Sequence, residues 1–173
     1  MMSGHVHCPP RNGYIRSLPL PFEVVPLKIY LDSCCYGRPY DDQTQERIRE
    51  EATAKMAIQR TISSGIIDLI SSEYLIAENN DRRDEVEKQS IETFIYANSK
   101  DIVESGNFPE LLELADRIAL TSIKPMDSRH VASAMVSHCD YFITTDDRIL
   151  KYRSDRIKIV GPREFARGEG IGF

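Results

Sequence analysis

The sequence has 173 residues, of which 41% are hydrophobic and 28% charged, and its formal net charge at pH 7 is −5. A chain of this length buries roughly two-thirds of its unfolded surface without disulfide or metal staples, which predicts one globular domain. Nine glycines and nine prolines are too few for a collagen-like or low-complexity chain, and no apolar run approaches the ~18 residues of a membrane span. The acidity also disfavours a nucleic-acid partner, because phosphate-binding proteins are usually basic.

Residues 1–26 are expected to form an irregular N-terminal lead-in, since five prolines interrupt them. This stretch lacks the continuous apolar segment of a secretory signal, so a cytoplasmic protein with reduced cysteines is expected. Three of its residues have a spacing that would allow metal binding, although a passive tail is the simpler interpretation. They are His5, His7 and Cys8.

From residue 27 onward, strand-like and helix-like segments alternate, and residues 27–167 are expected to form one domain followed by a C-terminal tail, 168–173. Strands are predicted at 27–31, 66–70, 101–104, 141–145 and 157–160, and a loop follows the first of them. Helices are predicted from Asp41 or Asp42 to Ser63, from a cap at Ser72, over 83–97, from Pro109, and over 127–138. Strands separated by helices pair in parallel, which predicts a three-layer α/β/α sandwich around a mainly parallel sheet of about five strands.

Four acidic residues are expected at one edge of this sheet. Asp32 and Asp146 directly follow the first and fourth strands, and ligands bind such sheets at the carboxyl ends of strands. Asp127, at the first position of its helix, and Glu78 both fall on helix faces that are otherwise apolar. Each acid alone has an ordinary interpretation as a cap, a turn residue or a helix-edge residue. Together they would repel one another unless a cation compensated them, and carboxylate-only sites favour Mg²⁺ or Mn²⁺.

Other catalytic motifs do not compete with this set. The sequence contains no Gly-x-Ser-x-Gly, Walker A, Gly-x-Gly-x-x-Gly or His-Glu-x-x-His pattern. The neighbours Cys34 and Cys35 lie beside Asp32, whose charge disfavours a thiolate nucleophile.

Four segments resemble PIN domains, the fold of metal-dependent ribonucleases that includes the VapC-type toxins. The resemblance covers about residues 27–165, and its last two segments are the more specific. The segments are Lys28-Ile-Tyr-Leu-Asp32-Ser33, Ser71-Ser-Glu-Tyr-Leu-Ile-Ala-Glu78, Lys124-Pro-Met-Asp127-Ser-Arg-His130-Val-Ala-Ser-Ala134 and Tyr141-Phe-Ile-Thr-Thr-Asp146-Asp-Arg-Ile-Leu150. Ser33 and Ser128 depart mildly from the family pattern, and neither removes a carboxylate.

The resemblance implies a Mg²⁺- or Mn²⁺-dependent endoribonuclease, with a role as the toxin of a toxin–antitoxin pair, a small antitoxin partner and a homodimer. It also implies residue roles. The catalytic, metal-binding set is Asp32, Glu78, Asp127 and Asp146, and the supporting residues are Ser33, Thr144, Thr145 and Asp147. Glu73 is a weaker rival for Glu78, and His130 is expected to be structural. Two alternatives stay open: a non-catalytic RNA-binding or interaction domain of the same fold, and a phosphohydrolase acting on a small phosphate ester.

Basic residues gather near the predicted site despite the acidic total. Between residues 147 and 167, seven Lys and Arg stand against three acids, a local balance of +4. The candidates for RNA binding are Arg38, Arg129, Arg148 and Lys151, and the candidates for base stacking are Tyr36, Tyr40 and Tyr74. A solvated surface, or buried tyrosines, would explain the same residues. The charge of −5 therefore does not exclude a polyanionic substrate, and binding is expected to depend on the divalent ion.

Overall fold

The computed structural model describes residues 25–173 of the chain. The metal site considered at His5, His7 and Cys8 therefore lies outside the described residues, as does nearly all of the predicted lead-in. The described residues form a five-stranded sheet in the order β3-β2-β1-β4-β5, in which every neighbouring pair is parallel. The strands are β1 (Leu27–Leu31), β2 (Ile67–Ser72), β3 (Ser99–Val103), β4 (Tyr141–Ile143) and β5 (Lys158–Val160). The predicted α/β class and parallel sheet are confirmed.

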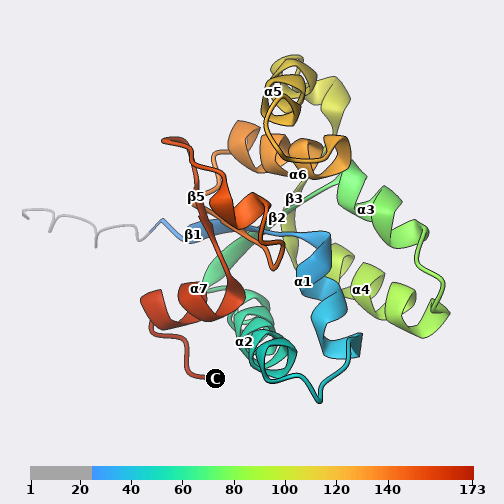
Figure 1. Ribbon diagram of the computed structural model, residues 1–173, viewed down its shortest axis with the longest axis vertical. Coiled ribbons are helices and arrows are strands. Elements are labelled where there is room, and N and C mark those ends of the chain that lie inside the picture. The colour runs from blue at the N-terminus through green and yellow to red at the C-terminus, as the bar shows by residue number, and fades with distance from the viewer. Residues whose placement is uncertain (1–24) are drawn as a thin grey trace, which may run out of the picture.

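Seven α-helices accompany these strands in the described part of the chain. They are α1 (Ser33–Gly37), α2 (Glu46–Ser63), α3 (Glu73–Asn80), α4 (Glu85–Asn98), α5 (Glu110–Ala119), α6 (Pro125–Val136) and α7 (Pro162–Gly168). Figure 1 shows α2 and α7 on one side of the sheet and α5 and α6 on the opposite side, which gives the three layers of a sandwich. No helix between residues 25 and 173 combines the length and apolarity needed to cross a bilayer.

The central strand β1 is buried on both faces, as expected for a parallel sheet covered by helices. Ile29, Tyr30 and Leu31 have no exposed surface. The apolar side of α5 packs into the same core through Leu111 and Ile118, which fits its 3.6-residue periodicity. The packed sheet therefore determines the positions of the residues that directly follow the carboxyl end of each strand.

Several predicted boundaries differ from the structure. The segment after β1, expected as a loop, folds into α1 and a short 3₁₀ turn over Arg38–Tyr40, because the Asp32 carboxylate caps α1 and Pro39 fits the first turn of the 3₁₀ segment. The cap expected at Asp41 or Asp42 is wrong. The N-cap of α2 is Gln45, and Asp42 instead closes a turn by accepting hydrogen bonds from Thr44.

The start of α6 also differs by two residues. The helix begins at Pro125, which needs no hydrogen-bond partner for its nitrogen at the first position, so Asp127 is its third residue and not its first. The helix ends at Val136, and His138 lies beyond it in the left-handed region, with φ of 55°. Asp127 is therefore no N-cap, and its carboxylate is left for contacts outside its own helix.

Candidate active site

The connection between strands changes direction at β1. The chain proceeds from β1 through β2 to β3 on one side and returns to β4 and β5 on the other, so β1 and β4 form the topological switch point at which open parallel sheets bind ligands. Asp32 follows β1, and Asp146 follows β4 after two threonines. The sheet topology thus brings these two acids to the same edge, as predicted.

The Asp32 carboxylate is buried and fully hydrogen-bonded. Its Oδ1 accepts from the Ser33 amide at 2.8 Å, while Oδ2 accepts from Thr144 Oγ1 at 2.7 Å and from Cys34 Sγ at 3.1 Å. Only 4% of Asp32 is exposed. Three local donors therefore hold the carboxylate in one orientation. Thr144 contributes its hydroxyl, whereas Ser33 contributes its backbone amide and not its hydroxyl.

Asp146 forms a fork-like ion pair with a side chain from its own turn. Its Oδ1 accepts from the backbone amide of Arg148 at 2.8 Å and from Nε at 3.1 Å, and Oδ2 accepts from Nη2 of the same guanidinium. These charge-assisted bonds hold the pKa of Asp146 below its usual value. Thr144 Oγ1, which donates to Asp32, accepts from the Asp146 amide at 3.1 Å, so one hydroxyl links the two carboxylate-bearing segments.

Asp127 is the acid with the least favourable surroundings. Partial burial, together with the charges of Asp32 and Asp146, raises its pKa. Its nearest cation is Arg148, whose Nη2 lies 3.9 Å from Asp127 Oδ2. Three carboxylates from β1, β4 and α6 therefore share one electrostatic environment, and one guanidinium neutralises part of it.

Glu78 is held by a buried chain of hydrogen bonds that crosses β1. Its Oε2 lies 2.7 Å from His130 Nε2, and His130 Nδ1 lies 2.9 Å from the Tyr30 hydroxyl. That hydroxyl lies 2.6 Å from Ser72 Oγ, which accepts from the Leu75 amide. The His130 bond is the main cause of the lowered pKa of Glu78.

The proton positions in this chain follow from its donors and acceptors. Ser72 Oγ accepts from Leu75, so its own proton is free to point at the Tyr30 oxygen. Burial raises the pKa of Tyr30, so its hydroxyl stays protonated between Ser72 Oγ and His130 Nδ1. The Glu78 carboxylate, whose pKa is lowered, is ionised and can only accept, so His130 Nε2 donates to it. His130, expected to be structural, positions a predicted site carboxylate.

The rival acid Glu73 is engaged elsewhere. Its Oε1 accepts from the backbone amide of Ser105 at 2.8 Å, so it ties the first turn of α3 to the segment after β3. Glu78, on the same helix, instead contacts His130, which lies three residues after Asp127 on α6. The role of Glu78 in the site stays a prediction.

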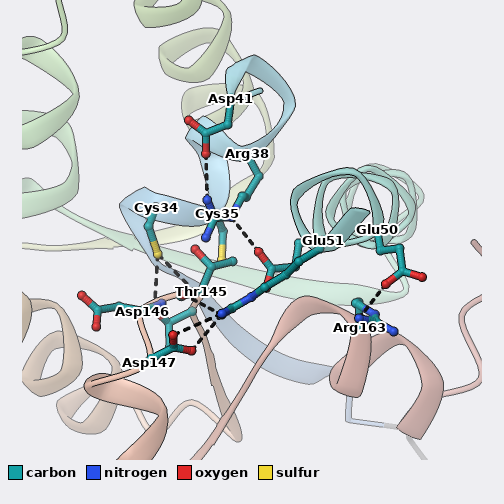
Figure 2. Close-up of polar contacts among 12 residues, drawn as sticks. Cys34, Cys35, Arg38, Asp41, Glu50, Glu51, Thr145, Asp146, Asp147 and Arg163 are labelled. Atoms are coloured by element: carbon teal, nitrogen blue, oxygen red, sulfur yellow. Dashed lines mark hydrogen bonds and ion pairs between the residues drawn. The ribbon is translucent and has the colours of Figure 1, made fainter. Parts of the chain in front are cut away.

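A network of ion pairs supports the loop that carries Asp146. The buried carboxylate of Glu51 accepts from Arg47 and forms an ion pair with Arg38, and Arg47 also binds Asp147 through two nitrogens, at 2.8 and 3.1 Å. Figure 2 shows Glu51 between Arg38 and the Asp146–Asp147 turn, with the two aspartates pointing apart. Asp147 therefore anchors the turn to α2, while Asp146 remains at the acidic edge.

Cys34 lies against the same turn. Its sulfur accepts from the Thr145 amide at 3.3 Å and donates to Asp32, and Figure 2 shows the thiol directed at the Thr145–Asp146 segment. Its neighbour Cys35 is buried, which raises the pKa of that thiol well above its usual value. Cys34, Cys35 and Cys139 are all unpaired, as expected for reduced thiols.

The metal-binding geometry stays a prediction. Among residues 25–173, no three His, Cys, Asp or Glu side chains lie close enough together to hold an ion as they stand. The carboxylates are also engaged by protein donors: Asp32 by three, Asp146 by Arg148 and Glu78 by His130. The donor set itself is all oxygen, as hard divalent ions prefer.

The four predicted RNA-binding residues have different surroundings. Arg148 lies in the acidic cluster, and Lys151 is exposed. Arg129 lies over the Tyr74 ring at 5.4 Å, whereas Arg38 is committed to Asp41 and Glu51. The tyrosines divide similarly: Tyr36 is fully buried and cannot stack on a base, and Tyr40 is 49% exposed.

Sequence reasoning missed one residue beside the site. Arg82, between α3 and α4, donates to the Ser33 carbonyl at 3.0 Å and to its hydroxyl at 3.2 Å, and it pairs with Glu87. Its distance of 49 residues from Ser33 leaves no local signal. The Asp127 to His130 spacing, in contrast, places both on one helix face and was a usable signal.

Comparisons with known proteins add little to this geometry. Neither the protein-family models nor the curated proteins give a match. Among solved structures, the chain is similar to the crystal structure of FitAcB from Neisseria gonorrhoeae, with 16% sequence identity and a TM-score of 0.46 over 78% of this chain and 97% of the other.

Proposed function

We propose that this protein is a metal-dependent endoribonuclease that hydrolyses RNA phosphodiester bonds at the acidic edge of its sheet. The observation that carries the proposal is that Asp32, Asp146 and Asp127 gather at the switch point between β1 and β4, where burial and the charges of the other two raise the pKa of Asp127. Placing negatively charged carboxylates close together costs free energy unless a cation binds between them. The PIN-like sequence segments name the same residues.

The chain's own residues fit a divalent ion by their chemistry. Asp32 and Asp146 would be its primary ligands, Asp127 would complete the set, and Glu78 would hold a second ion or a water. When bound, such an ion lowers the pKa of a coordinated water and stabilises charge that develops on the phosphate. Thr144 keeps Asp32 and the Asp146 segment in register through its hydroxyl.

Arg148 has a defined part in this proposal. Its guanidinium occupies the place of a counter-ion between Asp146 and Asp127, so it must release Asp146 before that carboxylate can hold an ion. The released side chain, 43% exposed at its present position, would then be free to contact a phosphate of the substrate, as Arg commonly does.

The sequence resemblance extends the proposal to partners. It implies the toxin half of a toxin–antitoxin pair, with a small antitoxin protein, and a homodimer. A neighbouring small gene encoding a DNA-binding protein would support the first of these. Light scattering that shows a monomer at micromolar concentration would contradict the second.

The test of the activity uses purified protein, a mixture of single-stranded RNAs, and Mn²⁺, Mg²⁺ or EDTA. We expect cleavage with either ion, none with EDTA, and a loss of at least about 100-fold in Asp32→Asn and Asp146→Asn. The exposed Asp155 provides the matched control, and Asp155→Asn should cleave normally. Cleavage that persists in EDTA, or that both site variants retain, would contradict the metal-dependent mechanism.

One observation supports a second function. The Arg148 pair neutralises Asp146 without any ion, as would suit a non-catalytic RNA-binding domain of this fold. In that case the same RNAs would bind with equal affinity in EDTA and in Mn²⁺, with no cleavage in either. Binding that requires the ion would favour the nuclease.

A further inference from the structure

Among residues 25–173, no strand pairs with the outer edge of β5. β5 is the last strand in the sheet order, and two of its residues bond toward β4: the Lys158 amide donates to Asp140, and the Val160 carbonyl accepts from Thr144. Backbone groups of successive residues in a strand point to opposite sides. The amide and carbonyl of Ile159 therefore point away from the sheet.

A groove runs along this edge. Its volume is about 920 Å³, and its walls are formed by residues of β5, of the 150–154 segment and of α7. Apolar side chains contribute to it, including Leu150, Tyr152 and Ile157. A strand edge that lines a hollow of this volume has room for one more extended chain, since neighbouring strands lie roughly 4.8 Å apart.

The groove is also positively charged. Arg153, Lys158 and Arg167 line it, and none of these three forms an ion pair with a carboxylate in the described part of the chain: Arg153 donates to backbone carbonyls, and the other two lie over aromatic rings. A fourth cation, Arg163, is neutralised by Glu50 (Figure 2). Glu164 is the one acid among the lining residues.

We propose that this edge binds an extended, acidic peptide segment of a partner protein, which adds to β5 as a sixth strand. Backbone bonds to Ile159 would supply affinity, and alternate side chains of the peptide would reach the basic walls. This inference does not rest on the proposed nuclease activity, since none of the groove residues belongs to the acidic set.

Two other occupants fit less well. A second copy of this chain would set Lys158 against Lys158 or its basic surroundings, and edge lysines are a common protection against such self-pairing. Single-stranded RNA would satisfy the cations, but it lacks the alternating N–H and C=O groups of a strand that would pair with both the amide and the carbonyl of Ile159. An acidic peptide satisfies both the charges and the backbone edge.

The first experiment measures fluorescence anisotropy with an eight-residue fluorescein-labelled peptide of alternating glutamate and valine, in EDTA and low salt. We expect binding that weakens as salt is raised, and at least tenfold weaker binding of a lysine–valine peptide. The acidic peptide with N-methyl groups on alternate amides should also bind at least tenfold more weakly. Equal binding of the three peptides, or none, would overturn the proposal.

The second experiment changes the protein. Ile159→Pro removes an outward amide that bonds to no neighbouring strand, so it should weaken peptide binding at least tenfold while circular dichroism shows an unchanged fold. Ile159→Val keeps the amide and should bind within twofold of the wild type. Binding that is equal in Ile159→Pro would contradict strand addition.

Charge reversal completes the test. The double variant with Arg153→Glu and Arg167→Glu should lose the acidic peptide and gain affinity for the lysine–valine peptide. A 12-nucleotide oligouridine serves as the competing ligand. If it binds through Arg153 and Arg167 while the acidic peptide does not bind, the groove is an RNA site and the proposal is wrong. Failure here leaves the metal-dependent cleavage test unaffected.

Discussion

The two halves of the acidic edge are built in different ways. Glu78 is held by a buried chain of hydrogen bonds through His130, Tyr30 and Ser72, and its pKa is lowered. Asp146 and Asp127 instead face a partly exposed cation, the Arg148 guanidinium, and the pKa of Asp127 is raised. One half is fixed by packing and the other by charge.

This difference assigns separate tasks to the two halves. A buried hydrogen-bond chain resists salt and keeps its geometry, because its partners have no water to exchange with. A carboxylate pair balanced by one arginine can exchange that cation for another. We therefore expect changes in the first half to alter stability, and changes in the second to alter cation binding.

The largest effect on stability is expected from Tyr30→Phe. Removing the hydroxyl leaves His130 Nδ1 and Ser72 Oγ each without a buried hydrogen-bond partner, which costs about 2 kcal/mol of the free energy of unfolding. Urea denaturation followed by circular dichroism measures it.

The matched control is Tyr141→Phe. The Tyr141 hydroxyl donates to Glu169 near the surface, so its removal should cost under about 0.5 kcal/mol. If the two variants were equally stable, the buried chain would not fix the Glu78 half.

The next effect concerns Arg148→Ala. Removing the guanidinium frees Asp146 Oδ2 and leaves Oδ1 with only the backbone amide of residue 148, so Mn²⁺ affinity should rise about tenfold, which corresponds to about 1.4 kcal/mol. Calorimetric titration measures it, and Arg153→Ala, outside the acidic cluster, should leave the affinity unchanged. Weaker Mn²⁺ binding in Arg148→Ala would show that the arginine assists the ion and does not compete with it.

A smaller effect is expected from Asp127→Asn in the absence of divalent ions. Because the folded-state pKa of Asp127 is raised, the folded state binds this proton more readily than the unfolded state, and stability falls as the pH rises through that range. Asn removes this cost, so at pH 7 the melting temperature should rise by about 2 °C. The gain should vanish near pH 3, where both states are protonated, and a gain that persists there would have another origin.

Most of the fold and part of the candidate site could be predicted from the sequence. Strand periodicity and strand-end acids located the parallel sheet and the residues Asp32 and Asp146, because these signals are local. The partners of those acids were not predictable: Arg148 belongs to a turn whose geometry decides where its side chain points, and Arg82 reaches Ser33 only through the tertiary fold. The exact start of α6 was not predicted either, because a proline and an aspartate two residues apart are both favoured in the first turn of a helix.

The central claim, that the acidic edge holds a divalent ion, is tested most directly by calorimetric titration of Mn²⁺ into the wild type and Asp32→Asn. Asn can still accept from Ser33 and donate to Thr144 or Cys34, the present partners of Asp32, so the variant should fold. We predict saturable binding by the wild type and by Asp155→Asn, and at least tenfold weaker binding by Asp32→Asn. No binding by the wild type, or equal affinity in Asp32→Asn, would contradict the account.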